Sequence, residues 1–393
     1  MSHSPTDRQE LIALVRALHG TSTPWIPAGL GTRLHWGPCL NPQHQTVSCR
    51  ELNRVIDHAI DDLTITVEAG MPLQQLQSLL ADHGQWLPVD WPWGGEPHGT
   101  VGGLVARGMA GGLRQRHLGV RDQIIGIGLL RSDGVEAKAG GRVVKNVAGY
   151  DLMRLLCGSW GSLALITELT LRVQPMRPSH GALRLHGPLN GLERCRAAVV
   201  HSSLTPERFD WINSGTGEWQ LHLMVSSVAD AAVTSQLEDV AALAAEHGLD
   251  CEHHPCSDPL MPSQQRSPEA GRWLVRVMVS PSRLHDLLKS RECSGLAQWS
   301  WNLAAGAGCG DGWAPLDDAT PVNAVESLRN RVEQLGGQLM VLVQPDAAGQ
   351  RLPAWGDAPA KALIEAVKRQ FDPKQQLNRG RLPGVQGGVQ ITA

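Results

Sequence analysis

Residues 94–112 read GGEPHGTVGGLVARGMAGG, and eight of these nineteen residues are glycine. Glycine loses more conformational freedom on folding than any other residue, so this density carries a large entropic cost. It is useful where the backbone must come very close to another group or must adopt a positive φ. The stretch therefore predicts a segment of backbone that closely approaches a ligand or another part of the fold.

Three further motifs flank this stretch: PAGLGT at residues 27–32, KNVAGYD at residues 145–151 and GSWGSL at residues 158–163. Glycine loops can point successive backbone N–H groups at a diphosphate, because no side chain is in the way. We interpret the four segments together as the wall of a flavin-dinucleotide pocket. A Rossmann fingerprint is excluded, since Leu34 stands where a third glycine is needed and Pro38 interrupts the expected helix.

The composition limits the class of protein. A chain of 393 residues is typical of two or three domains, and the net charge of −3 without a basic run argues against nucleic-acid binding. The eight cysteines include no C-x-x-C pair, which favours reduced thiols in the cytoplasm. No apolar run approaches the roughly 20 residues of a transmembrane helix, and the N-terminus does not resemble a signal peptide. We expect no membrane-spanning segment.

The periodicity of apolar residues predicts alternating helices and strands. In the first part we expect helices over 6–18, 48–59, 72–84 and 150–156, and strands over 25–26, 64–68, 123–131 and 163–173. The helix over 48–59 rests on an apparent capping box, Ser48 to Glu51, followed by an apolar stripe. In the second part we expect strands over 183–185, 219–225, 273–279 and 338–343, helices over 229–247, 282–290 and 321–335, and loops over 251–270 and 304–320. The expected class is α+β.

In this order, the motifs resemble the FAD-binding domain of the vanillyl-alcohol-oxidase/PCMH flavoprotein superfamily, and within it the FAD-binding subunits of bacterial glycolate oxidases (glycolate dehydrogenases). The matching segments are PAGLGTR at 27–33, EAG at 68–70, TVGG at 100–103, GGRVVKNVAGYD at 140–151, GSWGSLALITE at 158–168, FDP at 371–373 and LNRG at 377–380. The resemblance is close over residues 20–178 and looser over 360–383.

The resemblance implies a domain organisation and a set of cofactor contacts. Residues 1–178 would form a PCMH-type FAD-binding domain of two subdomains, residues 179–357 an α+β cap with helices on one face of an antiparallel sheet, and residues 358–393 a helix and tail returning to the FAD domain. The implied contacts are Pro27, Ala28, Gly29, Leu30, Gly31, Thr32, Gly99, Thr100, Val101, Gly102, Gly103, Lys145, Gly149, Tyr150, Ile166 and Asn378.

Physically, residues 29–32 would form one nest of amides, with the Thr32 hydroxyl as a further donor. Thr100, Gly102 and Gly103 would supply facing amides. For both loops the alternative is a glycine-rich turn that packs against a neighbour.

Four of the implied contacts have an ordinary structural alternative. Lys145 lies either near the cofactor or in solvent, and Tyr150 packs either on the cofactor or in the core. Ile166 would present backbone groups to the adenine end, or is a core isoleucine. Asn378 either approaches the isoalloxazine or lies in a turn that follows a helix.

The pyrophosphate loop has Ala28 and Leu30 where some members of the superfamily have a histidine or cysteine bonded to the flavin, so we expect non-covalent FAD. His98, the nearest histidine in the central stretch, would at most line the pocket.

Hydroxy-acid dehydrogenases of this superfamily typically carry a metal-bound histidine pair and a G-D-G-N-x-H segment. This chain has GDGW at 310–313 instead. The segment CEHHPC at 251–256 has the spacing of no common zinc site, and no cysteine run typical of iron–sulfur clusters is present. We expect no metal site, and the sequence indicates no catalytic base. Substrate oxidation and electron export would then require a partner flavoprotein subunit and an iron–sulfur subunit.

Three functions remain open. In the first, the chain is an FAD-carrying subunit of a glycolate (2-hydroxy acid) dehydrogenase complex. Such a complex would be cytoplasmic, and any peripheral contact with the membrane would be made through the partner subunits. Alternatively, it is a self-sufficient FAD-dependent dehydrogenase or oxidase of another small alcohol or hydroxy acid. The third hypothesis is a non-catalytic assembly subunit with a vestigial FAD site, which Ala164 favours because the family more often has glycine there.

Overall fold

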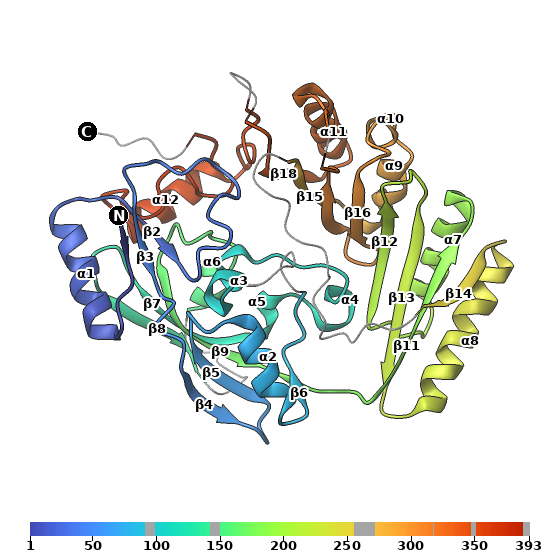
Figure 1. Ribbon diagram of the computed structural model, residues 1–393, viewed down its shortest axis with the longest axis horizontal. Helices are drawn as coiled ribbons and strands as arrows, with labels where there is room; N and C mark the ends of the chain where they lie inside the picture. The colour runs from blue at the N-terminus through green and yellow to red at the C-terminus, as the bar shows by residue number, and fades with distance from the viewer. Residues whose placement is uncertain (91–98, 142–149, 255–271, 317, 347–350, 388–393) are drawn as a thin grey trace.

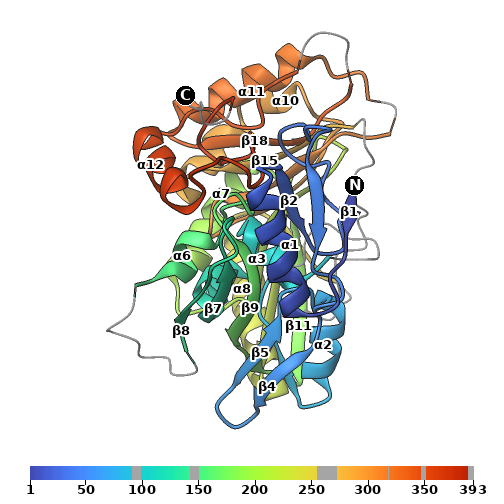
Figure 2. The same ribbon diagram turned by 90° about the vertical axis from the view of Figure 1, so that its left-hand side faces the viewer.

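A computed structural model describes residues 1–90, 99–141, 150–254, 272–316, 318–346 and 351–387 of the chain. Two large sheets organise these residues, one with five strands in the N-terminal half and one with eight strands in the C-terminal half (Figure 1). The view turned by 90° shows α10 and α11 at one end of the molecule and β4 and α2 at the other (Figure 2). Among these residues, no helix combines the length and apolar character that crossing a membrane requires.

The chain begins with a small parallel sheet in the order β1–β3–β2 and one helix. Their bounds are β1 Ser2–His3, α1 Arg8–Gly20, β2 Trp25–Ala28 and β3 Gln45–Ser48. The Asp7 side chain caps α1 by accepting a hydrogen bond from the amide of Glu10. Leu11 and Val15 on α1 are buried against Trp25 and Val47, so the helix covers this sheet.

The five-stranded sheet has the order β4–β5–β9–β7–β8, and all its pairs are antiparallel. Its strands are β4 Val55–Ala59, β5 Thr64–Glu68, β7 Ile124–Leu130, β8 Glu136–Gly140 and β9 Leu165–Arg172. The accompanying helices are α2 Leu73–Ala81, α3 Val101–Arg107, α4 Arg114–His117, α5 Val120–Gln123 and α6 Leu152–Leu156, and β6 Gln85–Trp86 pairs with β10 Gln174–Pro175. Helices α2 and α3 bury leucine and valine side chains in the core of this sheet.

The expected helix over residues 48–59 is wrong. This segment contains the end of β3, a turn, and β4, which pairs with β5. The Ser48 hydroxyl donates to the carbonyl of Gly29 at 2.7 Å instead of capping a helix. The helical spacing of the apolar residues was coincidental, because Val55 and Ile56 are partly exposed on an edge strand.

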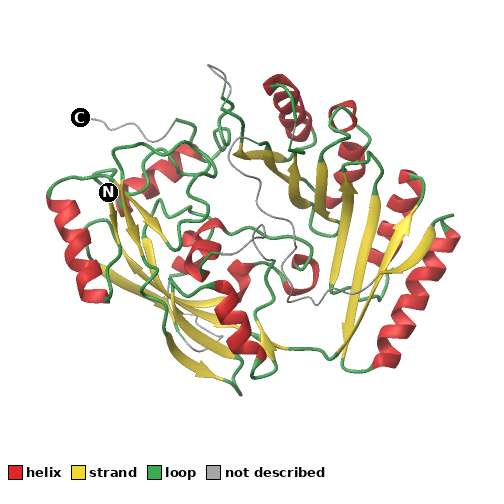
Figure 3. Ribbon diagram, viewed as in Figure 1, coloured by secondary structure: helices red, strands yellow, loops and turns green. Residues whose placement is uncertain are grey.

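The eight-stranded sheet has the order β14–β11–β13–β12–β16–β17–β15–β18. Its strands are β11 Ser179–His186, β12 Arg208–Ser214, β13 Gln220–Ser227, β14 Asp250–His254, β15 Leu274–Met278, β16 Ser300–Ala304, β17 Cys309–Trp313 and β18 Gln338–Val343. Its helices are α7 Leu189–His201, α8 Asp230–Glu246, α9 Leu284–Leu288, which follows a 3-10 turn at Pro281–Arg283, α10 Arg291–Ser294 and α11 Val322–Gln334. Figure 3 shows α7 and α8 on the side of the sheet that faces away from the N-terminal half. The α+β class is confirmed.

Two expected loops in this part contain strands. Residues 309–313 form β17, and residues 250–254 form β14 at the sheet edge. Both strands are short and polar or glycine-rich, so the sequence lacks the apolar alternation that would have indicated them. Sheet pairing with β15 and β16 for β17, and with β11 for β14, determines their conformation.

The C-terminal helix α12, Lys361–Phe371, returns to the N-terminal half. Its side chains Ile364, Val367 and Phe371 pack against the core of the five-stranded sheet. Leu377, which follows the helix, pairs with Trp25 of β2. The domain boundaries at 178 and 357 stay a prediction.

Candidate functional site

Strand β2 leads directly into the first glycine loop, residues 29–32. The amides of Leu30, Gly31 and Thr32 donate to no acceptor in the described parts of the chain, and Gly31 has a φ of 74°. Consecutive N–H groups around a residue of positive φ form a concave arrangement that binds anions. This loop can therefore offer three successive amides to a negatively charged ligand.

The second glycine loop lies against the first. A Cβ atom on Gly29 would overlap the Thr100 side chain, so only glycine allows the two loops to approach this closely. Gly99 has a φ of 93°, and Thr100 caps α3 by accepting a hydrogen bond from the amide of Gly103 at 3.2 Å. The structure thus brings the two predicted loops together, although 70 residues separate them in the sequence.

The amides at the start of α3 are used inside the fold. Gly102 donates to the carbonyl of Ala69 at 2.9 Å, and Val101 donates to the carbonyl of Met71 at 2.9 Å. A Cβ atom on Gly102 would lie 2.8 Å from both the Cβ and the carbonyl oxygen of Ala69. Close packing therefore explains glycine at position 102, and the expected facing amide of this residue is already satisfied.

The loop at residues 158–163 and the C-terminal tail complete the site. Gly161 packs on Pro27, since a Cβ atom there would lie 2.7 Å from Pro27 Cγ. Asn378 has a φ of 47°; its amide donates to the carbonyl of Trp25 at 2.8 Å, and its Nδ2 donates to the carbonyl of Trp160. The Asn378 Oδ1 atom is buried and accepts no hydrogen bond from a described residue.

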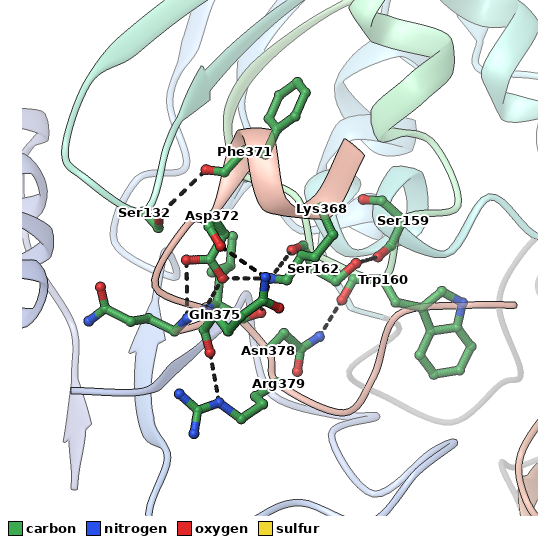
Figure 4. A network of polar contacts seen from close by, with 12 residues as sticks. Ser132, Ser159, Trp160, Ser162, Lys368, Phe371, Asp372, Gln375, Asn378 and Arg379 are labelled. Carbon is green, nitrogen blue, oxygen red and sulfur yellow. Dashed lines mark hydrogen bonds and ion pairs between the residues drawn. The ribbon is translucent and has the colours of Figure 1, made fainter. Parts of the chain in front are cut away.

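A buried ion pair positions this tail (Figure 4). Lys368 Nζ donates to Asp372 Oδ2 at 2.6 Å, to the carbonyl of Ser162 at 2.6 Å and to the carbonyl of Leu377 at 2.7 Å. Burial lowers the pKa of Lys368, while the Asp372 carboxylate opposes this shift. Since Asp372 also accepts from the amides of Gln376 and Leu377, the pair links α12, the 158–163 loop and the segment that carries Asn378.

Two other predicted contacts lie away from the glycine loops' packing contacts, and two cannot be placed. Ile166 lies in β9 and belongs to the core of the five-stranded sheet, which agrees with its structural alternative. The Tyr150 side chain is 90% exposed, so its interpretation as a core tyrosine is wrong. Lys145 and Gly149 lie outside the described residues, as does His98. The role of all these residues in cofactor binding stays a prediction.

Three arginines that were not among the expected cofactor contacts lie beside this site: Arg33, which ends the PAGLGTR motif, Arg107 and Arg381. Arg33 Nη1 donates to Thr32 Oγ1 at 2.9 Å, and Arg107 Nη2 donates to the carbonyl of Arg33 at 3.2 Å. Arg381 Nη2 donates to the carbonyl of Trp36. They come from three distant segments, so no local spacing could have indicated that they form a cluster.

In the ranges that the structure describes, no group of three or more His, Cys, Asp or Glu side chains is arranged to hold a metal ion. The rings of His222 and His254, which belongs to the CEHHPC segment, have centroids 5.5 Å apart. Burial and the neighbouring Arg184 cation lower the pKa of His222 to about 3, so this ring is neutral. Asp311 of the GDGW segment forms a buried ion pair with Arg276 at 2.9 Å.

Comparisons with known proteins agree with this geometry. Residues 3–140 match a family model described as an FAD binding domain. Over 176 residues the chain is 35% identical to the glycolate oxidase subunit GlcE of Escherichia coli (strain K12), a match that covers 45% of this chain and 49% of that protein.

Two further relatives match over a similar share of this chain and a smaller share of their own length. The mitochondrial D-lactate dehydrogenase (cytochrome) of Arabidopsis thaliana is 30% identical over 180 residues, which is 46% of this chain and 31% of that protein. The glycolate oxidase subunit GlcD of Bacillus subtilis (strain 168) is 26% identical over 215 residues, 54% of this chain and 45% of that protein. The matches thus span about half of these relatives' length or less.

The fold itself is shared with solved structures. An alkyldihydroxyacetonephosphate synthase matches with a TM-score of 0.70 over 96% of this chain and 75% of the other, at 14% identity. This likeness concerns the fold alone, and together with the family match it confirms the PCMH-type architecture expected from the sequence.

Proposed function

We propose that the chain is the FAD-carrying subunit of a 2-hydroxy-acid dehydrogenase complex that oxidises glycolate to glyoxylate. The proposal starts from the match of residues 3–140 to a family model described as an FAD binding domain. The observation that carries this proposal is the convergence of the unused amides of residues 30–32, the Thr100 loop and the Asn378 tail. The similarity to GlcE supports the choice of complex.

The residues present fit the cofactor. The amides of Leu30, Gly31 and Thr32 would bind the diphosphate, which carries negative charge and only accepts hydrogen bonds. Asn378 Oδ1 is a buried acceptor without a donor, and it would accept an N–H group of the cofactor. Bound there, FAD would supply a two-electron acceptor that can pass electrons on singly. Since residues 27–32 include no histidine or cysteine, the cofactor would be held non-covalently.

Oxidation of the acid would take place in a partner flavoprotein subunit, and an iron–sulfur subunit would carry the electrons onward. Two observations support this division. Among the described residues, no group of three or more His, Cys, Asp or Glu side chains is arranged to hold a metal ion, and the Asp311 carboxylate of the GDGW segment is engaged in an ion pair with Arg276. Two differently named glycolate oxidase subunits, GlcE and GlcD, both resemble this chain. We place the complex in the cytoplasm, with any membrane contact made by its partners.

A second function has its own support. The chain also resembles D-lactate dehydrogenases, so a self-sufficient FAD-dependent dehydrogenase of a small hydroxy acid is the alternative. A vestigial FAD site in an assembly subunit is a weaker alternative. Ala164, which suggested it, is a core residue at 1% exposure whose methyl group is accommodated by packing.

The test is a visible absorption spectrum of the purified chain before and after acid precipitation. A flavin chromophore released into the supernatant would support non-covalent FAD. Turnover of glycolate by the chain alone, with an artificial electron acceptor, would favour the self-sufficient enzyme over the subunit. A colourless protein that also fails to take up added FAD would contradict both and favour the assembly subunit.

A further inference from the structure

Three guanidinium groups gather around two buried tryptophans beside the candidate FAD site. The Cζ of Arg107 lies 4.7 Å from the ring centroid of Trp36 and 5.9 Å from that of Trp160. Arg33 lies 5.6 Å from the Trp36 ring, and Arg381 lies 5.8 Å from the Trp160 ring. Ring faces attract cations, but this attraction neutralises no charge. The cluster therefore concentrates positive charge inside the protein.

The hydrogen bonds described for Arg107 and Arg381 go to neutral carbonyl groups. Arg107 donates to the carbonyl of Arg33, and Arg381 donates to the carbonyl of Trp36. Arg381 is 3% exposed, and its Nε has no acceptor. Neither Arg107 nor Arg381 forms an ion pair with a carboxylate in the parts of the chain that are described.

Two buried arginines elsewhere in the molecule are paired with acids: Arg196 contacts Glu193 at 2.7 Å, and Arg276 contacts Asp311 at 2.9 Å. A third, Arg329, donates to the carbonyl of Pro353 instead. The contrast matters because a buried charge without a counter-charge is strongly destabilising. The fold supplies a carboxylate to Arg196 and Arg276, whereas Arg107 and Arg381 lie together in one cluster without a carboxylate partner among the described residues.

The pKa values of the three arginines are lowered by their surroundings. Burial lowers the pKa of Arg33 to about 10 and the pKa of Arg381 to about 10. Burial also lowers the pKa of Arg107, and the charges of Arg33 and Arg381 lower it further. With pKa values of about 10, Arg33 and Arg381 are cationic at neutral pH, so an anion placed beside them would offset the cost of burial and the repulsion within the cluster.

We propose that Arg33, Arg107 and Arg381 form an oxyanion site that takes a phosphate or carboxylate group of a ligand at the FAD site. Planar guanidinium groups bind such groups through paired, charge-assisted hydrogen bonds. Arg33 ties the cluster to the glycine loops, because its Nη1 bonds Thr32 and would lie 3.3 Å from a Cβ atom on Gly99. This inference rests on the proposed function in one respect only, the identification of the bound dinucleotide as FAD.

Two ligands could supply the oxyanion that the three arginines bind. The oxyanion belongs either to the diphosphate of FAD or to a free small carboxylic acid that binds beside the cofactor. The second source would give this chain its own acid-binding site, instead of leaving that role to a partner subunit.

The experiment compares Arg107→Gln and Arg381→Gln with the parent chain and with Arg369→Gln. The control changes an arginine on α12 whose side chain is 50% exposed and 3.9 Å from Glu365. Calorimetric titration of the flavin-free chain measures binding of FAD and of inorganic pyrophosphate. Titration of the FAD-loaded chain with oxalate, followed by the visible difference spectrum, measures binding of a small carboxylate.

Loss of one charge-assisted hydrogen bond should weaken the affected affinity by about tenfold or more. If the cofactor supplies the oxyanion, both variants bind FAD and pyrophosphate more weakly, while oxalate leaves the parent spectrum unchanged. If a free acid supplies it, the variants retain FAD affinity and lose the spectral response to oxalate. Binding of all three probes as tightly as in the parent chain would overturn the proposal.

Two further measurements keep the test decisive. If a glutamine variant does not fold, Arg381→Lys retains charge without the planar fork, and its weaker binding of the same probes would serve as the test. A parent chain that never binds FAD would contradict the proposed function, but calorimetric titrations of this flavin-free chain with pyrophosphate and with oxalate would still test the arginine site. Binding of neither anion by the flavin-free parent would overturn the oxyanion site.

Discussion

The loop at residues 29–32 and the start of α3 at residues 100–103 are both rich in glycine and touch each other, yet they use their backbones in opposite ways. The amides of residues 30–32 have no acceptor within the described chain. The amides of Val101, Gly102 and Gly103 all donate to acceptors of the fold. From the sequence, both loops were expected to present amides to the diphosphate.

The difference teaches that glycine serves two purposes here. At Gly31 it permits a positive φ that leaves neighbouring amides pointing outward, and at Gly102 it permits contact with Ala69. The C-terminal tail repeats the contrast. Lys368 has three acceptors, whereas Asn378 Oδ1 and Arg381 Nε have no described partner. Substitutions in the satisfied groups should change stability, and substitutions in the unsatisfied groups should change ligand binding.

The largest effect is expected for Lys368→Met, which removes one member of the buried pair and leaves the Asp372 carboxylate without its counter-charge. Breaking such a pair from one side destabilises a protein by about 3–5 kcal/mol. Urea denaturation of the flavin-free chain measures this loss. Lys361→Met on the same helix is the control, since its exposed pair with Asp357 should contribute nothing measurable. Equal midpoints for the two variants would contradict the structural role of Lys368.

Gly102→Val should have the next largest effect, again without FAD. The new side chain would meet Ala69 at 2.8 Å, and overpacking of this kind costs about 1–3 kcal/mol. The free energy of unfolding of the flavin-free protein should fall by this amount, and FAD content should fall as a consequence. A variant that keeps its full stability but loses FAD would instead show that residue 102 faces the cofactor.

A smaller effect on stability, but a direct one on binding, is expected for Gly31→Ala. Alanine at a positive φ costs about 1–2 kcal/mol, and the nearest atom, Leu34 Cδ1, lies 3.6 Å from the new Cβ. Gly84→Ala is the matched control, because Gly84 has a φ of 64° and open space around it. The two variants should lose similar stability, as thermal unfolding of the flavin-free chains would show.

Binding of FAD should separate this pair of variants. Only Gly31→Ala shifts amides that would bond the diphosphate, and the loss of one such bond weakens binding by about tenfold. Fluorescence titration with FAD measures both affinities. An equal affinity for FAD in the two variants would remove residues 30–32 from the binding site.

The sequence predicted those parts of the fold and site where one local pattern dominates. Helices α8 and α11 and strand β18 lie within one residue of their expected bounds, because long apolar stripes specify them. The loop at 27–32 and Asn378 were identified from motifs, and the structure brings them together around Trp25 and Trp160.

The remaining features depend on contacts between distant segments. Strand β4 carries a stripe with helical spacing, and only its pairing with β5 makes it a strand. Arg33 and Arg107 are 74 residues apart, and Arg381 is 345 residues from its partner Trp36. No window of the sequence contains such a cluster, so the fold must be known before the cluster can be identified.

The smallest predicted effect concerns two buried acids, Asp210 in β12 and Glu207 directly before it. The contributions of these two acids to the free energy of unfolding should depend on pH in opposite directions. Burial tends to raise the pKa of Glu207, but hydrogen bonds from His117 and Ser226 and the charge of Arg116 lower it overall. Burial raises the pKa of Asp210; the Arg208 cation opposes this shift and the Asp90 carboxylate adds to it. Glu207 is a satisfied group, whereas Asp210 Oδ1 is buried without a described hydrogen-bond donor.

The direction of each pKa shift determines how the stability contributed by that acid changes with pH. A carboxyl group with a lowered pKa stabilises the fold above the ordinary glutamate pKa of about 4.3, and this contribution is lost as the pH falls through the folded pKa. A carboxyl group with a raised pKa contributes its stability at low pH and loses it as the pH rises from the ordinary aspartate pKa to the folded one. The free energy of unfolding relative to Glu207→Gln should therefore decrease on acidification, and that relative to Asp210→Asn should increase. Urea denaturation of the parent and both variants between about pH 3 and pH 7 measures these differences, and slopes of the same sign would show that hydrogen-bond satisfaction does not distinguish the two acids.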